Sequence, residues 1–492
     1  MSRTSTRRVI SPSSRRVSVQ EEELEFQWRG KKEAKAAACS LPVGRLTECP
    51  RERIGSSRGA HEFIESENLE AMKLLIPDLE NQVKMIYIDP PYNTGRDFVF
   101  RDQPATRSGA TRRARSGRHA AWLSMMYPRL VAARRLLNPQ GVLFASIDDV
   151  EQAHLTLLLN EIFGEENRVG TLVWTGGRKN DSRLVSVSHE YMLCYAKDRK
   201  SLAGSKATWR ERKAGLDRIY SQYELLRSRC GGDHALISAA LKQWYAQLPD
   251  GDPAKAHAHY CKSDERGVYF ADNLSWPGGG GPTYPVAHPL TGRPCKTPSR
   301  GWVFADAETM RNMIKEDRID FGPDENKVPT RKRYLRETEG QSLHSVFYQD
   351  GRSASQRLTK MFGKKVFDHP KDERVLGRLV RAVTGEGDLL MDFFAGSGTF
   401  GHAVLAENEK DGRNRRFVLI QQPESTGWDD YPNIAEVAKE RLRRVAEQLQ
   451  NDRNPQTPGV LPDLGIRVFR WTSAPGKPAE TPSAENPWDR EN

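Results

Sequence analysis

The sequence predicts an α/β fold built around a mostly parallel β-sheet. Short, β-branched and apolar runs such as 83–88 and 142–147 have the pattern of buried strands. Amphipathic stretches with helical spacing, such as 68–79 and 121–137, lie between such runs. Strands that alternate with helices favour a sheet covered by helices on both faces.

The same two patterns predict the elements in chain order. Strands are expected at 63–64, 83–88, 142–147, 169–174, 188–196, 388–394 and 416–420, with a short one at 466–471. Helices are expected at 68–79, at 121–137, before Gly164, and at 375–384, 400–409 and 433–449.

Composition divides the chain into five parts. Residues 1–60 hold thirteen basic residues against seven acidic ones, which is typical of a disordered basic arm. Two α/β portions, 61–197 and 346–450, flank an insert at 198–345 in which aromatic and basic residues interleave. Residues 451–492 form a Pro-rich tail. Residues 101–120 carry six arginines. This composition predicts a flexible loop that contacts phosphate.

The first candidate site follows the strand at 83–88, where the sequence reads Asp89-Pro90-Pro91-Tyr92. Two prolines end a strand, because they remove backbone donors and fix φ. The Asp89 carboxylate and the Tyr92 ring are therefore expected at the carboxyl edge of the sheet, where α/β proteins bind ligands. A strand-to-turn junction without chemistry is the alternative.

The second candidate site is a glycine turn, Phe394–Thr399, between a predicted strand and a predicted helix. Gly396, Gly398 and Gly401 have the spacing of a dinucleotide fingerprint, but the turn lacks the Gly-Lys-Ser/Thr of a phosphate loop. A nicotinamide dehydrogenase is therefore an alternative, and it would require nicotinamide binding. The turn also suits a ligand with an amino acid moiety and an adenosine. Asp392 is the candidate for the ligand's ammonium, and Glu424 is the candidate for its ribose hydroxyls.

Charge and cysteine content restrict the class of protein. The net charge of +11 and the isoelectric point near 9.3 suit a polyanionic partner. The six cysteines lack CxxC spacing, which predicts reduced thiols, a cytoplasmic location and no metal site. No apolar run reaches the roughly 20 residues that span a bilayer, and we expect neither a membrane anchor nor a secretory signal.

Together, the two motifs resemble the amino-methyltransferases of DNA that use S-adenosylmethionine. The catalytic motif precedes the cofactor motif, as in the circularly permuted β class, where the target-recognition region lies between them. Stretches such as DPPYNTGRDFVF, WLSMMYPRL, EIFGEEN, SHEYMLCYAK, FDHPKD and NRRFVLIQQPE resemble the modification (Mod) subunits of Type III restriction systems. These stretches span about residues 62–445.

The resemblance implies a Rossmann-like methyltransferase fold, with a catalytic half at 61–197, a target-recognition insert at 198–345 and a cofactor half at 346–450. It further implies that the target base is flipped out of the duplex. Asp89 and the Pro90 carbonyl would then accept hydrogen bonds from the exocyclic amine, and Tyr92 would stack on the base. Pro91 completes the rigid catalytic motif.

The resemblance also implies which residues bind the cofactor, S-adenosylmethionine. They are Asp392, Phe394, Ala395, Gly396, Ser397, Gly398, Thr399, Glu424 and Lys371. Lys371 would support the carboxylate of the cofactor.

The expected function is therefore site-specific methylation of adenine N6 in double-stranded DNA, because Asp at position 89 favours adenine. Methylation of the exocyclic amine of cytosine and a non-catalytic specificity subunit are the alternatives. The resemblance leaves open a homodimer and a partner of the Type III restriction (Res) helicase-nuclease kind.

Overall fold

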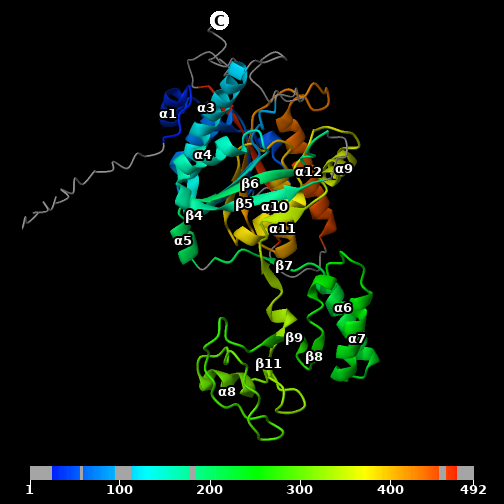
Figure 1. Cartoon of the computed structure of the whole chain (residues 1–492). Helices are drawn as coiled ribbons and strands as arrows, with labels where there is room; N and C mark the ends of the chain where they lie inside the picture. The colour runs from blue at the N-terminus through cyan, green and yellow to red at the C-terminus, as the bar shows by residue number, and fades with distance from the viewer. Residues whose placement is uncertain are drawn as a thin grey trace, which may run out of the picture. The chain divides into compact units, whose positions relative to one another are not determined.

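The computed structural model describes residues 25–55, 59–94, 112–176, 183–205, 207–453 and 461–473. The chain forms two compact units (Figure 1). The first takes in Met1–Lys206, Ser345–Val380 and Thr384–Asn492, and the second takes in Ala207–His344 and Arg381–Val383.

The first unit is organised around a ten-stranded sheet with the order β1-β16-β2-β15-β14-β3-β4-β6-β5-β13. Six of its nine strand pairings are parallel, which confirms the predicted α/β class. The strands are β1 (Arg45–Glu48), β2 (His61–Glu65), β3 (Val83–Ile88), β4 (Leu137–Ile147), β5 (Arg168–Thr175), β6 (His189–Ala196), β13 (Val346–Tyr348), β14 (Leu389–Asp392), β15 (Arg416–Gln421) and β16 (Ile466–Thr472).

The centre of this sheet joins the two distant halves of the chain. Strand β14 lies between β15 and β3 and is parallel to both. Met391 of β14 is opposite Ile86 of β3, so the two strands run side by side toward the same edge. The turns after β3 and β14 therefore leave the sheet at neighbouring positions.

Helices cover both faces of the sheet. Ile86 and Ile88 pack into one core with Met72 of α2, Met126 of α3 and helix α4. On the opposite face, Tyr87 stacks on Phe400 of α11 with ring centroids 5.5 Å apart. The helices of this unit are α1 (Lys31–Cys39), α2 (Asn68–Leu79), α3 (Arg112–Leu136), α4 (Gln152–Phe163), α5 (Arg199–Gly204), α9 (Gly351–Phe362), α10 (Glu373–Val383), α11 (Thr399–Asp411) and α12 (Ile434–Asp452).

The prediction of a disordered arm at 1–60 is wrong for its described part. Phe26 and Trp28 pack against the core of the first unit, and helix α1 follows them. Strand β1 pairs antiparallel with β16 at the other end of the chain. This pairing satisfies backbone groups of β1 that would otherwise be unpaired. The local sequence of β1 does not reveal its distant partner. Residues 1–24 lie outside the described residues.

Two other expectations have different outcomes. The strand expected at 466–471 is confirmed as β16, which also pairs in parallel with β2, so this part of the predicted tail belongs to the sheet.

The basic loop predicted at 101–120 is wrong from Arg112 onward, because α3 begins there. Arginine and alanine are good helix formers, and they extend the helix beyond its amphipathic part. Residues 101–111 lie outside the described residues.

The second unit contains helices and two small sheets. A four-stranded sheet has the order β10-β11-β9-β8, and β7 pairs with β12. The buried faces of α6 and α7 pack with Tyr260, Val268 and Leu335. The elements are β7 (Arg210–Arg212), α6 (Leu216–Arg229), α7 (His234–Gln247), β8 (Lys262–Asp264), β9 (Gly267–Asn273), α8 (Ala307–Lys315), β10 (Ile319–Asp320), β11 (Thr330–Tyr334) and β12 (Gly340–Ser342).

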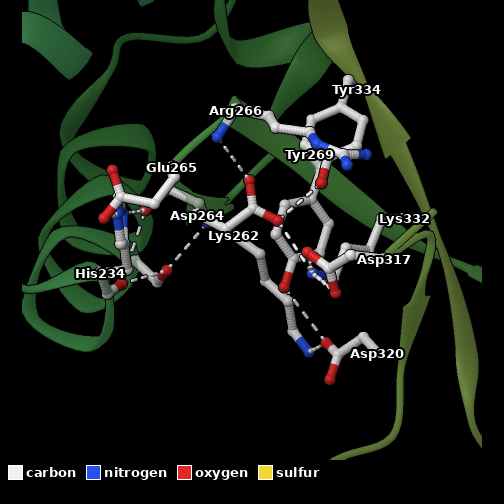
Figure 2. Close-up of polar contacts among 12 residues, drawn as sticks. His234, Lys262, Asp264, Glu265, Arg266, Tyr269, Asp317, Asp320, Lys332 and Tyr334 are labelled. Carbon is white, nitrogen blue, oxygen red and sulfur yellow. Dashed lines mark hydrogen bonds and ion pairs between the residues drawn. The ribbon is translucent and has the colours of Figure 1, made fainter. Parts of the chain in front are cut away.

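An ion cluster around the buried Lys332 links β11 to β8 and to Asp317, shortly before β10 (Figure 2). The Lys332 ammonium of β11 is 2.9 Å from Asp264 Oδ2 and 2.9 Å from each carboxylate oxygen of Asp317. Tyr334 Oη donates to Asp264 Oδ2 at 2.6 Å. Burial alone would lower the pKa of Lys332, but its hydrogen bonds to Asp317 and Asp264 outweigh burial and raise it.

We predict that Lys332→Met destabilises the second unit by about 3–5 kcal/mol, because it leaves a partly buried carboxylate without its cation. Arg333→Met is the matched control. Arg333 is the next residue of β11, is 45% exposed and pairs with Asp272, so its loss should cost at most about 1 kcal/mol. Hydrogen–deuterium exchange of β9 and β11 in the full chain measures the loss of stability in each variant. Equal loss of protection in the two variants would contradict the prediction.

None of the helices in the described ranges is long and apolar enough to cross a bilayer.

Candidate active site

The first motif lies at the carboxyl end of β3, where the apolar run stops and Asp89 begins a rigid turn. Pro90 is buried, and the Asp89 side chain is 28% exposed. Tyr92 Oη donates to Asp89 Oδ1 at 2.8 Å. The Trp122 indole of α3 donates to the Pro91 carbonyl at 2.6 Å, which fixes the turn from the helix side.

Lys371 and Glu190 complete a polar group around this turn. Lys371 Nζ lies 2.6 Å from Tyr92 Oη, 2.7 Å from Glu190 Oε2 and 3.3 Å from Asp89 Oδ1. The family resemblance predicts Lys371 near the carboxylate of a cofactor, and in the structure its ammonium contacts the side chains of the Asp89–Tyr92 turn. Glu190, from the start of β6, was not predicted. Its signal was a carboxylate at the polar end of an otherwise apolar strand.

The three charges of this group influence one another. Burial raises the pKa of Asp89 above its ordinary value, against the opposing effect of Lys371. Burial would also raise the pKa of Glu190, but the nearby Lys371 ammonium outweighs burial and lowers it. Burial alone would lower the pKa of Lys371, yet Asp89 and Glu190 together raise it. The lysine therefore favours the ionised form of both acids.

The glycine turn follows β14, next to the first motif. Asp392 ends that strand and is 2% exposed, and its Oδ1 accepts a hydrogen bond from the Phe394 amide at 2.9 Å. Burial raises the pKa of Asp392 well above its ordinary value. The Gly396 amide donates to Gln421 Oε1 at 2.7 Å. Gly396 has φ 53° and Gly398 has φ 75°, a left-handed backbone that favours glycine.

The hydroxyls of this turn are held from α12. Arg441 Nη1 donates to Ser397 Oγ at 3.0 Å and to Thr399 Oγ1 at 2.7 Å. These side chains therefore shape the turn from its buried side. Ala395 is buried, and Phe394 packs against the core. Glu424 is exposed, three residues after β15, so the structure does not bring it into the buried part of the turn.

We predict that Gly396→Ala weakens binding of S-adenosylmethionine by about tenfold, because a left-handed residue with a Cβ is strained by ~1–2 kcal/mol. The new Cβ would also lie 3.4 Å from Phe367. Gly412→Ala is the matched control: Gly412 has φ 68° at the far end of α11, and nothing lies within 4 Å of its Cβ position. Calorimetric titration of both variants measures the difference. Equal affinities would contradict the prediction.

The profile of the DNA methylase family (N6_N4_Mtase) matches residues 83–440, which include both motifs. The chain belongs to this family. Membership confirms the prediction of an enzyme that methylates DNA with S-adenosylmethionine as its cofactor.

Relatives of this DNA methylase include restriction-modification enzymes. It is 32% identical over 479 residues to the Type III enzyme EcoP15I Mod subunit of Escherichia coli, a match that covers 91% of this chain and 73% of the relative. It is 32% identical to the StyLTI Mod subunit of Salmonella typhimurium, covering 85% of this chain and 62% of the relative. It is 29% identical to the Type II methyltransferase M.KpnI of Klebsiella pneumoniae, a match that covers 72% of this chain and 79% of the relative. The resemblance to Mod subunits is thus confirmed.

Among solved structures, the methylase is similar to the PvuII DNA methyltransferase, described as cytosine-N4-specific. The TM-score is 0.36 and the identity 9%, over 82% of this chain and 97% of that one. For the M1.HpyAVI–SAM complex the TM-score is 0.30 and the identity 12%, over 77% of this chain and 98% of that one. At this level of overlap the fold assignment rests on the sheet order and strand directions described above.

Proposed function

We propose that this methylase transfers a methyl group to N6 of adenine in double-stranded DNA and that the Asp89–Tyr92 turn binds the base. The observation that carries the proposal is the pairing of β14 with β3. This pairing sets Asp89 and Asp392 at the same edge of the sheet, each at the end of its strand. A base at the first turn and a cofactor at the second would therefore meet.

On the base side, Asp89 and the Pro90 carbonyl accept hydrogen bonds from the exocyclic amine. Two acceptors draw the nitrogen lone pair out of conjugation and direct it toward the methyl group. Tyr92 stacks on the extruded base, a contact worth roughly 1–3 kcal/mol. Lys371 favours the ionised form of Asp89, in which both carboxylate oxygens are acceptors. Orientation of the two reactants supplies much of the rate.

On the cofactor side, the residues present fit S-adenosylmethionine. Asp392 is a buried carboxylate whose Oδ1 accepts the Phe394 amide, and the cofactor's ammonium is a matching cation. Gly396 and Gly398 carry no Cβ, so the backbone permits close approach. When bound, the cofactor supplies an electrophilic sulfonium methyl. Glu424 is our candidate for the ribose hydroxyls, and it would reach them from an exposed position on its loop.

Adenine is the proposed target because position 89 is Asp, whereas Ser is more typical of enzymes that methylate the cytosine amine. Both bases present an exocyclic amine to the same acceptors, so cytosine N4 is the second candidate. A subunit without activity is disfavoured, because the structure keeps Asp89, Tyr92 and the glycine turn together.

We further propose that the second unit reads the DNA sequence. It occupies the predicted place of the target-recognition insert and carries exposed arginines such as Arg210 and Arg266. The similarity to Mod subunits supports assembly with a Type III restriction (Res) subunit. A homodimer is a separate proposal, which sedimentation of the purified chain tests.

The function is tested by incubating the protein with S-adenosylmethionine and unmethylated duplex DNA and then identifying the nucleosides by mass spectrometry. We expect N6-methyladenine. N4-methylcytosine would support the second candidate, and no methylated nucleoside would contradict the proposal. A parallel reaction with Glu80→Gln, a surface variant, controls for preparation.

A further inference from the structure

A fully buried carboxylate lies behind the catalytic turn, on the side of α3 and α4. Glu151 is 0% exposed, and its backbone carbonyl accepts the amide of Leu155 in the first turn of α4 at 2.8 Å. Its side chain accepts hydrogen bonds from three residues. Asn93 Nδ2 is 2.5 Å and His119 Nδ1 2.6 Å from Oε1, while His154 Nδ1 is 2.8 Å from Oε2.

Asn93 links this carboxylate to the catalytic turn. It directly follows Tyr92, is 3% exposed and has φ 58°. Asparagine tolerates this left-handed backbone better than most residues, yet the conformation still requires support. The hydrogen bond from the Asn93 amide to Glu151 provides that support at the point where the chain leaves the base-binding residues.

The turn is therefore held at two successive points. Trp122 of α3 fixes the Pro91 carbonyl at 2.6 Å, and Glu151 fixes the Asn93 side chain. Between these points lies Tyr92, whose Oη is bound to Asp89. Rotation of the backbone at Asn93 would move Tyr92 and, through the rigid prolines, the Pro90 carbonyl.

We propose that Glu151 is a positioning residue that holds Asn93 and so keeps Asp89, Pro90 and Tyr92 in their reactive arrangement. The inference rests on the proposed function of that turn. Glu151 acts through Asn93, and a displacement of about 1 Å in a reacting group can cost about 100-fold in rate.

A metal ion is the alternative occupant, because the side chains of His119, Glu151 and His154 converge within 4.8 Å. The hydrogen bonds argue for the positioning role. Oε1 already accepts two donors and Oε2 one, so a metal would have to displace existing contacts. Within the described part of the chain neither Lys nor Arg forms an ion pair with Glu151, whose basic partners are the two imidazoles.

The test uses single-turnover methyl transfer, whose rate constant does not depend on the fraction of folded protein. We expect Glu151→Ala and Asn93→Gly each to lower it by about 100-fold. Asn93→Gly retains the left-handed backbone and removes only the amide. The double variant should be no slower than the slower single one, because both changes break the same link. Affinity for S-adenosylmethionine should change less than about twofold, since Asp392 and its turn are untouched.

A reciprocal exchange distinguishes positioning from folding and from metal binding. Asn93→Asp sets two carboxylates against each other, and adding Glu151→Gln restores an amide–carboxylate pair with its polarity reversed. We expect the exchange to recover about tenfold of the rate that Asn93→Asp loses. Gln152→Ala is the matched control, because Gln152 is the next residue and, among the described residues, its side chain hydrogen-bonds to Thr156 and not to Asn93 or Glu151.

Two results would overturn the inference while leaving the proposed function intact: an active wild-type protein with near wild-type rates in Glu151→Ala, or stoichiometric zinc in the purified protein that Glu151→Gln removes. An inactive wild-type protein would instead contradict the proposed function.

Discussion

Asp89→Ala is expected to abolish methyl transfer, with a loss of about 10³-fold or more in the single-turnover rate. In the proposed mechanism the carboxylate is the acceptor that activates the amine, and in the structure it is the partner of both Tyr92 and Lys371. Binding of S-adenosylmethionine should be retained, because Asp392 and the glycine turn belong to a separate strand. DNA affinity, measured by filter binding, and cofactor affinity, measured by calorimetric titration, should both stay near their wild-type values.

The matched control for this variant is Glu80→Ala. Glu80 is a carboxylate in the same unit, 44% exposed and paired with Arg135 at the surface. Its removal should leave the rate near that of the wild type. Near wild-type turnover of Asp89→Ala would show that the site assignment is wrong.

Lys371→Met is expected to lower the rate by about 100-fold at neutral pH and to change its pH dependence. Burial already raises the pKa of Asp89, and the Lys371 ammonium opposes that effect. Without the ammonium the pKa of Asp89 rises further, and the neighbouring Glu190 carboxylate adds to the rise. Asp89 must be ionised to accept the amine, so activity falls as pH drops through its pKa. The acid limb of the pH–rate profile should therefore move to higher pH in the variant.

Lys365→Met is the control for this experiment. Lys365 lies six residues earlier, is 70% exposed and pairs with Asp368. Its profile should overlay that of the wild type. If Lys371→Met also retained the wild-type acid limb, with only cofactor affinity reduced, Lys371 would act on the cofactor as the sequence resemblance implied.

Much of the first unit could be predicted because its signals are local. The helix at 68–79 and the strand at 83–88 match the structure residue for residue, since helical and strand periodicities change abruptly between them. The position of Asp89 at a sheet edge follows from the prolines. The side-by-side placement of β3 and β14 was expected only through the resemblance to a permuted family, because no local pattern specifies strand order.

The features that could not be predicted from the sequence depend on contacts between residues far apart in the chain. Strand β1 was assigned to a disordered arm, because its partner β16 lies at the opposite end of the chain. Glu190 and Lys371 meet only after β6 has paired with β4 and the segment before α10 has reached the turn after β3. Glu151 follows a strand within a run of acidic residues, and nothing in its neighbourhood identifies Asn93 as its partner. Burial of a polar side chain is therefore the property that sequence reasoning missed most consistently.

The central claim is tested most directly in a host that lacks its own DNA methylation, which expresses either the wild-type chain or Asp89→Ala. Methylation-sensitive sequencing of the genomic DNA identifies the base and its sequence context in one measurement. The proposed function predicts N6-methyladenine in one sequence context with the wild-type chain and none with Asp89→Ala. Methylated cytosine, or adenine methylation that persists in Asp89→Ala, would contradict it.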